Sequence, residues 1–270
     1  MRSAIRASTL TTTLLLTLAG CPPTPPEANP AAPPLPKPAP DPTACEPGKT
    51  AVPLTTQDGV ALEADLYSNG EVEGPGVVLL HMIPPSNDRT NYPADFIDDL
   101  VAKGITVLNV DRRGAGASKG DPKEAYEGAK GKLDVEAAIT FLSKGPCRVD
   151  ASRIALVGAS NGTTSAVDYA VMAHIDPNWP RPASLVLLTG GPYTENQHGL
   201  AGHSAALSMP VHFVYSVEER EWSEAQKEHA QPSWLFSIYK DGAHGTKMFA
   251  AAPTAREDVV TFLAKSLGVP

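Results

Sequence analysis

The stretch RIALVGASNG (Arg153–Gly162) guides the interpretation of this 270-residue chain, because it sets a serine between two glycines directly after an apolar run. A turn by itself needs only one glycine. Two glycines flanking Ser160 let a strand and a following helix pass close together, and they leave the hydroxyl in a place that larger neighbours would crowd. The pattern predicts a sharp strand-to-helix turn that presents Ser160 for nucleophilic attack.

Apolar runs and amphipathic segments alternate on both sides of this turn. Residues 51–56 and 60–67 predict an antiparallel hairpin. Further strands are predicted at 76–82, 105–111, 153–158, 183–191, 210–216 and 234–242, and helices at 92–104, 127–145, 163–174 and 254–268. Continuous apolar strands separated by such helices predict an α/β fold, with a mostly parallel central sheet and helices on both faces.

A serine hydroxyl needs a general base and an orienting carboxylate to attack a carbonyl. Of the seven histidines, only His244 lies in the loop between the last predicted strand and the final helix. In a parallel sheet that loop reaches the carboxyl edge of the strands, where Ser160 also lies. The acid is expected after the preceding strand: Glu219, three residues past Ser216, is preferred, and Glu218 is the alternative. A solvated acidic turn would explain the same glutamates without catalysis.

From about Thr50 to Gly268 the chain resembles the α/β-hydrolase superfamily in strand order and in motifs. GASNG is similar to the nucleophile elbow of that family, and GAHG is similar to the surroundings of its catalytic histidine. DRRGAGAS (Asp111–Ser118) resembles the Asp-x-Arg-Gly-x-Gly-x-Ser stretch after the family's fourth strand. The chain has no CxxC pair, phosphate-binding glycine-rich loop or paired metal-ligand histidines, so neither a cofactor nor a metal is implied.

The resemblance also implies an oxyanion hole made of two backbone amides. The first is the amide of Asn161, directly after the serine. The second is the amide of Met82 or Ile83, because the strand end LLHM resembles the family's His-Gly turn with Met82 in place of the glycine. The acid departs from the family as well, since Glu219 stands where most members carry aspartate.

About twenty residues, 191–209, separate the sixth predicted strand from the seventh, where the family carries its cap. A cap this short predicts an open, shallow pocket, as in small members of the dienelactone-hydrolase or carboxylesterase type. His198 and His203 lie in this segment. Contact with the substrate and a plain surface position are both compatible with these two histidines.

The first residues of the chain resemble a bacterial lipoprotein signal. Residues 1–20 combine two arginines, a short apolar stretch and small residues, and LAGC (Leu18–Cys21) resembles a lipobox. The resemblance implies cleavage before Cys21 and attachment of lipid to it, which would anchor the protein to a bacterial membrane, in the periplasm or at the cell surface. An ordinary secretory signal with a chance cysteine is the alternative.

Eleven of the 23 residues from 22 to 44 are proline, which predicts an extended spacer. The predicted organisation is therefore a signal peptide (1–20), a lipidated cysteine with a linker (21–44) and a hydrolase domain (45–270). In an oxidising compartment Cys45 and Cys147 are expected to form a disulfide, with two free thiols as the alternative. The net charge of −8 argues against a general nucleic-acid binder.

These observations predict a lipid-anchored serine hydrolase of the cell envelope that cleaves carboxylic esters through an acyl-enzyme. A peptidase or amidase of the same fold is one alternative, because ester and amide cleavage share the acyl-transfer chemistry. A catalytically degenerate binding lipoprotein is another, and Met82 together with the unusual acid favours it. The intact serine, histidine and elbow argue against degeneration.

Overall fold

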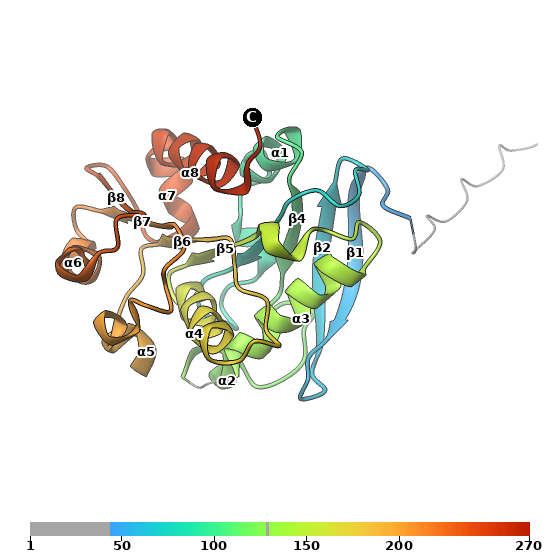
Figure 1. Cartoon of the computed structure of the whole chain (residues 1–270), viewed down its shortest axis with the longest axis horizontal. Helices are drawn as coiled ribbons and strands as arrows, with labels where there is room; N and C mark the ends of the chain where they lie inside the picture. Colours follow the sequence, from blue (N-terminus) through green and yellow to red (C-terminus); the bar gives the residue numbers. More distant parts are fainter. Residues whose placement is uncertain (1–43, 128–129) are drawn as a thin grey trace, which may run out of the picture. The chain divides into compact units, whose positions relative to one another are not determined.

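The computed structural model describes residues 44–127 and 130–270; the predicted signal peptide, Cys21 and nearly all of the linker lie outside these residues. Eight strands form one sheet in the order β1-β2-β4-β3-β5-β6-β7-β8 (Figure 1). β2 is antiparallel to β1 and β4, and the remaining neighbours are parallel. The strands are β1 (Gly48–Thr55), β2 (Ala61–Ser68), β3 (Gly76–Leu80), β4 (Thr106–Val110), β5 (Ile154–Ala159), β6 (Ser184–Leu188), β7 (Val211–Ser216) and β8 (Trp234–Tyr239). The predicted mostly parallel sheet with a leading hairpin is confirmed.

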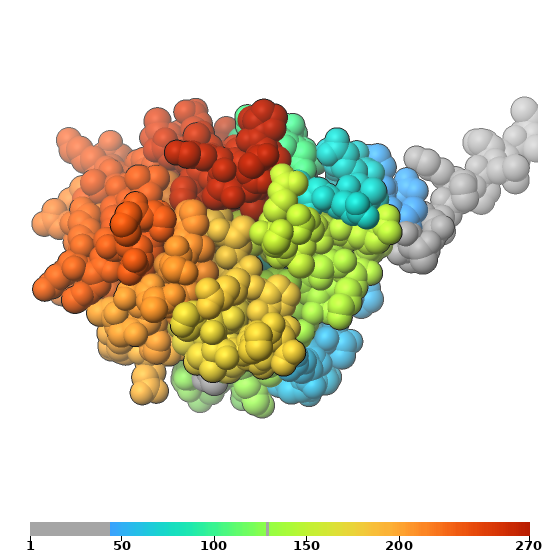
Figure 2. Space-filling view, viewed as in Figure 1, coloured from blue at the N-terminus to red at the C-terminus, as the bar shows by residue number. Residues whose placement is uncertain are grey.

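Helices cover both faces of the sheet, which explains why its central strands read as unbroken apolar runs. Along β3, Val78 and Leu80 pack on one face, and Val77 and Leu79 pack on the other. The first face is covered by α3 (Gly131–Lys144) and α4 (Gly162–Ile175), which lie side by side (Figures 1 and 2). The second is covered by α1 (Ala94–Ala102), α7 (Met248–Ala251) and α8 (Pro253–Leu267).

The loops that carry the predicted site residues leave the parallel strands at their carboxyl ends and so meet at one edge of the sheet. Three short helices lie in such loops: α2 (Pro122–Tyr126), α5 (Glu195–His198) and α6 (Arg220–Ala225). The segment between β6 and β7 holds only α5 and a 3-10 turn, Leu200–His203, so the predicted minimal cap is confirmed. None of the helices in the described ranges is both long and apolar enough to cross a membrane.

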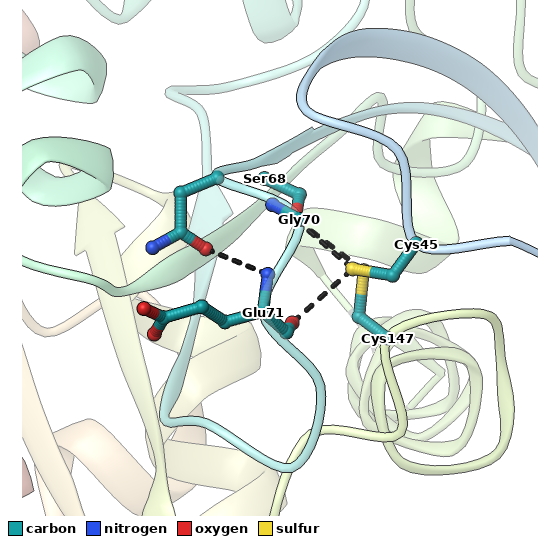
Figure 3. The surroundings of a disulfide bond; sticks show 6 residues. Cys45, Ser68, Gly70, Glu71 and Cys147 are labelled. Carbon is teal, nitrogen blue, oxygen red and sulfur yellow. Dashed lines mark hydrogen bonds between the residues drawn. A yellow bond between two sulfur atoms is a disulfide. The ribbon is translucent and has the colours of Figure 1, made fainter.

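A disulfide joins Cys45, just before β1, to Cys147, in the loop ahead of β5 (Figure 3). The two Cα atoms are 4.7 Å apart, although 102 positions separate the cysteines in the sequence. Ser68 Oγ lies 3.1 Å from Cys45 Sγ and accepts a hydrogen bond from the Gly70 amide. Because it closes a long loop in the unfolded chain, a bond of this kind stabilises a domain by about 2–4 kcal/mol.

Candidate active site

Ser160 occupies the turn between β5 and α4 with a backbone φ of +51°, in the left-handed region that serine rarely adopts. Its two flanking glycines have a steric reason. A Cβ on Gly162 would lie 2.2 Å from the Leu80 carbonyl oxygen, and a Cβ on Gly158 would lie 2.7 Å from the Gly162 carbonyl carbon. Backbones this close leave no room for side chains, so the glycines allow β3, β5 and α4 to converge under the serine.

The structure brings the three predicted triad residues into one hydrogen-bonded chain. His244 Nε2 lies 2.6 Å from Ser160 Oγ, and His244 Nδ1 lies 2.6 Å from Glu219 Oε1. A carboxylate that accepts from Nδ1–H leaves the Nε2 lone pair free to take the serine proton, which is the tautomer a general base needs. Glu218, the alternative acid, is exposed in the same turn. The geometry therefore favours Glu219 over Glu218.

The amides expected to form the oxyanion hole lie at the end of β3 and at the start of α4. Asn161 is the N-cap of α4, where backbone N–H groups have no partner within the helix. Across residues 44–127 and 130–270, the Asn161, Met82 and Ile83 amides donate no hydrogen bond. His81 Nδ1 lies 2.7 Å from the Met82 carbonyl oxygen. In a trans peptide the C=O and N–H groups point in opposite directions, so the Ile83 N–H faces away from His81.

Thr189, directly after β6, is a residue that the sequence did not single out. It is 1% exposed and has a φ of +46°, which is an outlier for a β-branched residue. Its Oγ1 accepts a 2.7 Å hydrogen bond from the amide of Gly245, the residue after His244. A strained backbone at the end of β6 thus fixes the loop that carries the histidine. No pattern in the sequence signals a positive φ at a threonine.

An open cavity of about 480 Å³ adjoins the triad, with His244 and Glu219 in its wall. Two aromatic rings form part of that wall, Tyr193 and Trp222. Each ring needs a glycine beside it. A Cβ on Gly190 would lie 2.6 Å from the Trp222 ring, and a Cβ on Gly191 would lie 2.8 Å from the Tyr193 ring.

Among the residues that the structure describes, the charged ones in the cavity wall are acidic: Glu219 and Glu221 contribute, and no lysine or arginine does. His198 is exposed and His203 is half-buried, and neither lines this cavity. The structure therefore favours a plain surface position for both histidines over contact with a substrate in this cavity.

Curated proteins match part of this chain in sequence. No protein-family model matches the chain. A polyketide transferase of Aspergillus fumigatus is 34% identical over 128 residues, 46% of this chain and 41% of the relative. A thiohydrolase of Arthrinium phaeospermum is 35% identical over 131 residues, 47% of this chain and 39% of the relative. The chain thus spans about two fifths of the length of these curated relatives.

Solved structures match over most of the chain. An esterase of Pyrococcus furiosus superposes with a TM-score of 0.63 at 21% identity, covering 82% of this chain and 91% of the esterase. The α/β hydrolase GrgF of Penicillium sp. superposes with a TM-score of 0.61 at 17% identity, covering 82% of this chain and 99% of its own. The chain has the α/β-hydrolase fold.

Met82 departs from the α/β-hydrolase His-Gly turn, and the structure accommodates it through a second glycine. The Met82 side chain is buried, and a Cβ on Gly245 would lie 2.3 Å from Met82 Sδ. The same Cβ would lie 3.7 Å from Ser160 Cβ, so the methionine sits beside the nucleophile. Gly245 has a φ of +58° and no side chain, so it leaves room for the Met82 side chain. A glycine at position 82 would not have needed that room.

Exchange of the triad acid separates the two candidate glutamates. In Glu219→Gln the amide cannot hold the His244 tautomer that accepts a proton from Ser160, so kcat for a p-nitrophenyl ester should fall by about a hundredfold or more. Glu218→Gln, the matched control, should stay within about twofold of wild type because an exposed neighbour contributes little to the triad. The reverse order of losses would assign the acid to Glu218.

Exchange of Thr189 tests whether its hydroxyl positions the histidine loop. Thr189→Val keeps the β-branched shape but leaves the Gly245 N–H buried without an acceptor, so kcat should fall about tenfold with little change in KM. Thr189→Ser keeps the hydroxyl and should retain activity within about threefold. Steady-state kinetics on one ester measures both variants. Equal activity of Val and Ser variants would show that the hydrogen bond does not position His244.

Proposed function

We propose that the protein is a serine hydrolase that cleaves carboxylic esters through an acyl-enzyme. The observation that carries the proposal is the continuous chain from Ser160 Oγ through the His244 imidazole to Glu219, with both contacts at 2.6 Å. The position of Ser160 at a strained elbow supports it, because a buried turn of this kind costs stability and is typical of reactive sites. The esterase among the structural matches has the same fold.

In the first half of the reaction, Ser160 Oγ attacks the ester carbonyl while its proton moves to His244 Nε2. The carbonyl oxygen becomes an oxyanion, which the Asn161 amide and the Met82 or Ile83 amide stabilise. Glu219 stabilises the imidazolium that forms. The tetrahedral intermediate then collapses, the bond to the alcohol oxygen breaks, and His244 returns the proton to the departing alcohol.

In the second half, His244 takes a proton from water, which attacks the acyl-enzyme carbonyl. A second tetrahedral intermediate collapses, the acid departs and Ser160 regains its proton. These steps use the ester, one water molecule and the side chains and amides named above. The open cavity beside His244 offers aromatic walls and carboxylates, which favours neutral or cationic substituents over anionic ones.

Thioester cleavage or acyl transfer is a second candidate, favoured by the polyketide transferase and thiohydrolase among the relatives. Both reactions share the acyl-enzyme and differ in the leaving group and in the acceptor. Amide cleavage by the same triad remains the alternative among the enzymes. A protein that keeps the fold for binding alone is the alternative that is not an enzyme.

A matched substrate panel tests these candidates. Oxygen esters, thioesters and amides that share one acyl group should be cleaved, with the oxygen ester fastest and with Ser160→Ala reducing kcat by several orders of magnitude. Stoichiometric labelling by a fluorophosphonate should disappear in the same variant. A faster thioester would favour the second candidate, and a faster amide would favour a peptidase or amidase. A wild-type protein that neither labels nor cleaves any member would favour a binding role.

We also propose that Cys21 is lipidated and that residues 22–44 tether the domain to a membrane of the cell envelope. The support is the lipobox-like LAGC stretch followed by a proline-rich segment. At about 3.1 Å per residue, a fully extended polyproline spacer of this length reaches roughly 70 Å. A tether of that reach lets the hydrolase meet substrates away from the bilayer.

Membrane fractionation tests the anchor separately from the chemistry. The wild-type chain expressed in a bacterium should sediment with membranes, and Cys21→Ser should be released or stay unprocessed. Both should hydrolyse small esters equally once solubilised, because the tether is not part of the site. A wild-type protein found entirely in the soluble fraction would contradict the anchor without affecting the triad.

A further inference from the structure

Arg112 is a buried charged residue that the triad mechanism leaves without a role. Its side chain has no exposed surface, and it lies beneath the elbow. One terminal nitrogen, Nη1, donates to Asn161 Oδ1 at 3.0 Å and to the His81 carbonyl oxygen at 3.3 Å. The other, Nη2, donates to the Ala125 carbonyl oxygen at 2.7 Å and to Ser165 Oγ at 3.0 Å.

All of these acceptors are neutral. Within the described parts of the chain, no carboxylate lies within salt-bridge distance of Arg112. Burial lowers the pKa of Arg112 to about 10, so the side chain remains charged at neutral pH. A buried cation with no carboxylate in direct contact costs stability, and such a cost is tolerated most often where the charge serves a site.

The adjacent residue, Arg113, is a contrasting case. It is equally buried, but it pairs with Asp134 at 2.8 Å, Asp58 at 3.0 Å and Glu124 at 3.1 Å. These contacts tie the loop after β4 to α2, α3 and the β1–β2 turn and do not include the elbow. Arg113 therefore has the contacts of a structural residue, and Arg112 does not.

The contacts of Arg112 converge on the two sides of the predicted oxyanion hole. On one side, Nη1 binds the side chain of Asn161, whose backbone amide is the first donor. On the other side, Nη1 also lies 3.5 Å from the Met82 carbonyl oxygen, and the Arg112 backbone amide donates to His81 Nε2 at 2.9 Å. An Nε2 that accepts leaves the proton on Nδ1, which donates to the Met82 carbonyl oxygen.

His81 can hold this tautomer because it remains neutral. Burial, and then the neighbouring Arg112 charge, lower the pKa of His81 to about 3. The imidazole therefore transmits the position of the Arg112 backbone to the Met82–Ile83 peptide across the range of pH in which a serine hydrolase works. With its carbonyl held on the His81 side, that peptide keeps its N–H on the opposite side.

We propose that Arg112 is a positioning residue for the oxyanion hole, acting on Asn161 with its guanidinium and on the Met82–Ile83 peptide through His81. The proposal rests on the proposed serine hydrolase function. The unpaired positive charge adds a second effect, because a cation beneath the elbow favours the negative charge that develops on the substrate oxygen.

The backbone that carries Arg112 is itself fixed, as a positioning role requires. Ser118 Oγ donates to the Asp111 carbonyl oxygen at 2.6 Å and accepts from the Glu63 amide at 2.9 Å. The Ala117 amide donates to Asp111 Oδ2 at 3.1 Å. A Cβ on Gly116 would lie 2.1 Å from that oxygen, so the turn closes tightly only with glycine there.

A matched pair of arginine exchanges tests the proposal. Arg112→Lys keeps the charge but cannot bridge Asn161 and the β3 end, so kcat should fall about tenfold, and Arg112→Met, which also loses the charge, should fall about a hundredfold. KM should change little in either. Arg113→Lys, the control, should lower the melting temperature and keep kcat per folded molecule within about twofold.

Two further readouts distinguish positioning of the oxyanion hole from general damage. A trifluoromethyl ketone forms an adduct that carries an oxyanion. In the Arg112 variants its inhibition constant should rise by the same factor by which kcat/KM falls. The inhibition constant of the matching methyl ketone should not change. Asn161→Ala, which removes one Arg112 contact but keeps the backbone amide, should lower kcat by about threefold to tenfold and serves if the Arg112 variants fail to fold.

The rate of fluorophosphonate labelling separates the two proposals. The wild-type protein could label at Ser160 while Arg112→Met and Asn161→Ala label and turn over at wild-type rates. That result would overturn the role of Arg112 and leave the serine hydrolase proposal intact. Unchanged trifluoromethyl ketone inhibition despite a loss of kcat would also overturn it. A wild-type protein that neither labels nor cleaves esters would overturn both proposals.

Discussion

The close approach of α4 to the end of β3 is the constraint on which the rest of the site depends. Gly162 sits against the Leu80 carbonyl oxygen at a distance that admits no side chain. This contact accompanies the left-handed conformation of Ser160. It also brings the Asn161 amide close to the loop between β3 and α1, which carries Met82 and Ile83. A larger residue at Gly162 would displace the nucleophile. It would also move the Asn161 amide away from the Met82 and Ile83 amides.

The ends of three strands position the candidate triad. The end of β5 supplies the nucleophile, the end of β6 supplies the Thr189 hydroxyl for the histidine loop, and the end of β7 leads to Glu219. Ser160 and Thr189 each have a strained backbone, and Glu219 contributes its hydrogen bond to His244. The sheet behind them is apolar on both faces and rigid, so the strain is supported by packing rather than relieved.

The sequence was sufficient for the fold and for the arrangement of the candidate triad because both depend on local patterns. Buried parallel strands are continuous apolar runs, and glycines on either side of a serine predict a tight turn. Thr189 and Arg112 could not be found in this way, since their roles come from contacts with residues distant in the sequence, Gly245 and Asn161. In DRRGAGAS the motif separates Arg113 from the variable position Arg112, but it does not indicate which of the two pairs with carboxylates. The short helices α2, α5, α6 and α7 were also missed, because segments of four to six residues are too brief to show a helical period.

The disulfide has a mechanical consequence. β1 is an edge strand that pairs in the sheet with β2 alone, and a pull from the amino-terminal side would ordinarily break the hydrogen bonds of such a strand one at a time. Cys45 precedes β1, so a force applied through the residues before it passes across the Cys45–Cys147 bond into the loop ahead of β5. Load is thereby diverted from an edge strand to the centre of the sheet, where β5 pairs on both sides and several hydrogen bonds would have to shear at once.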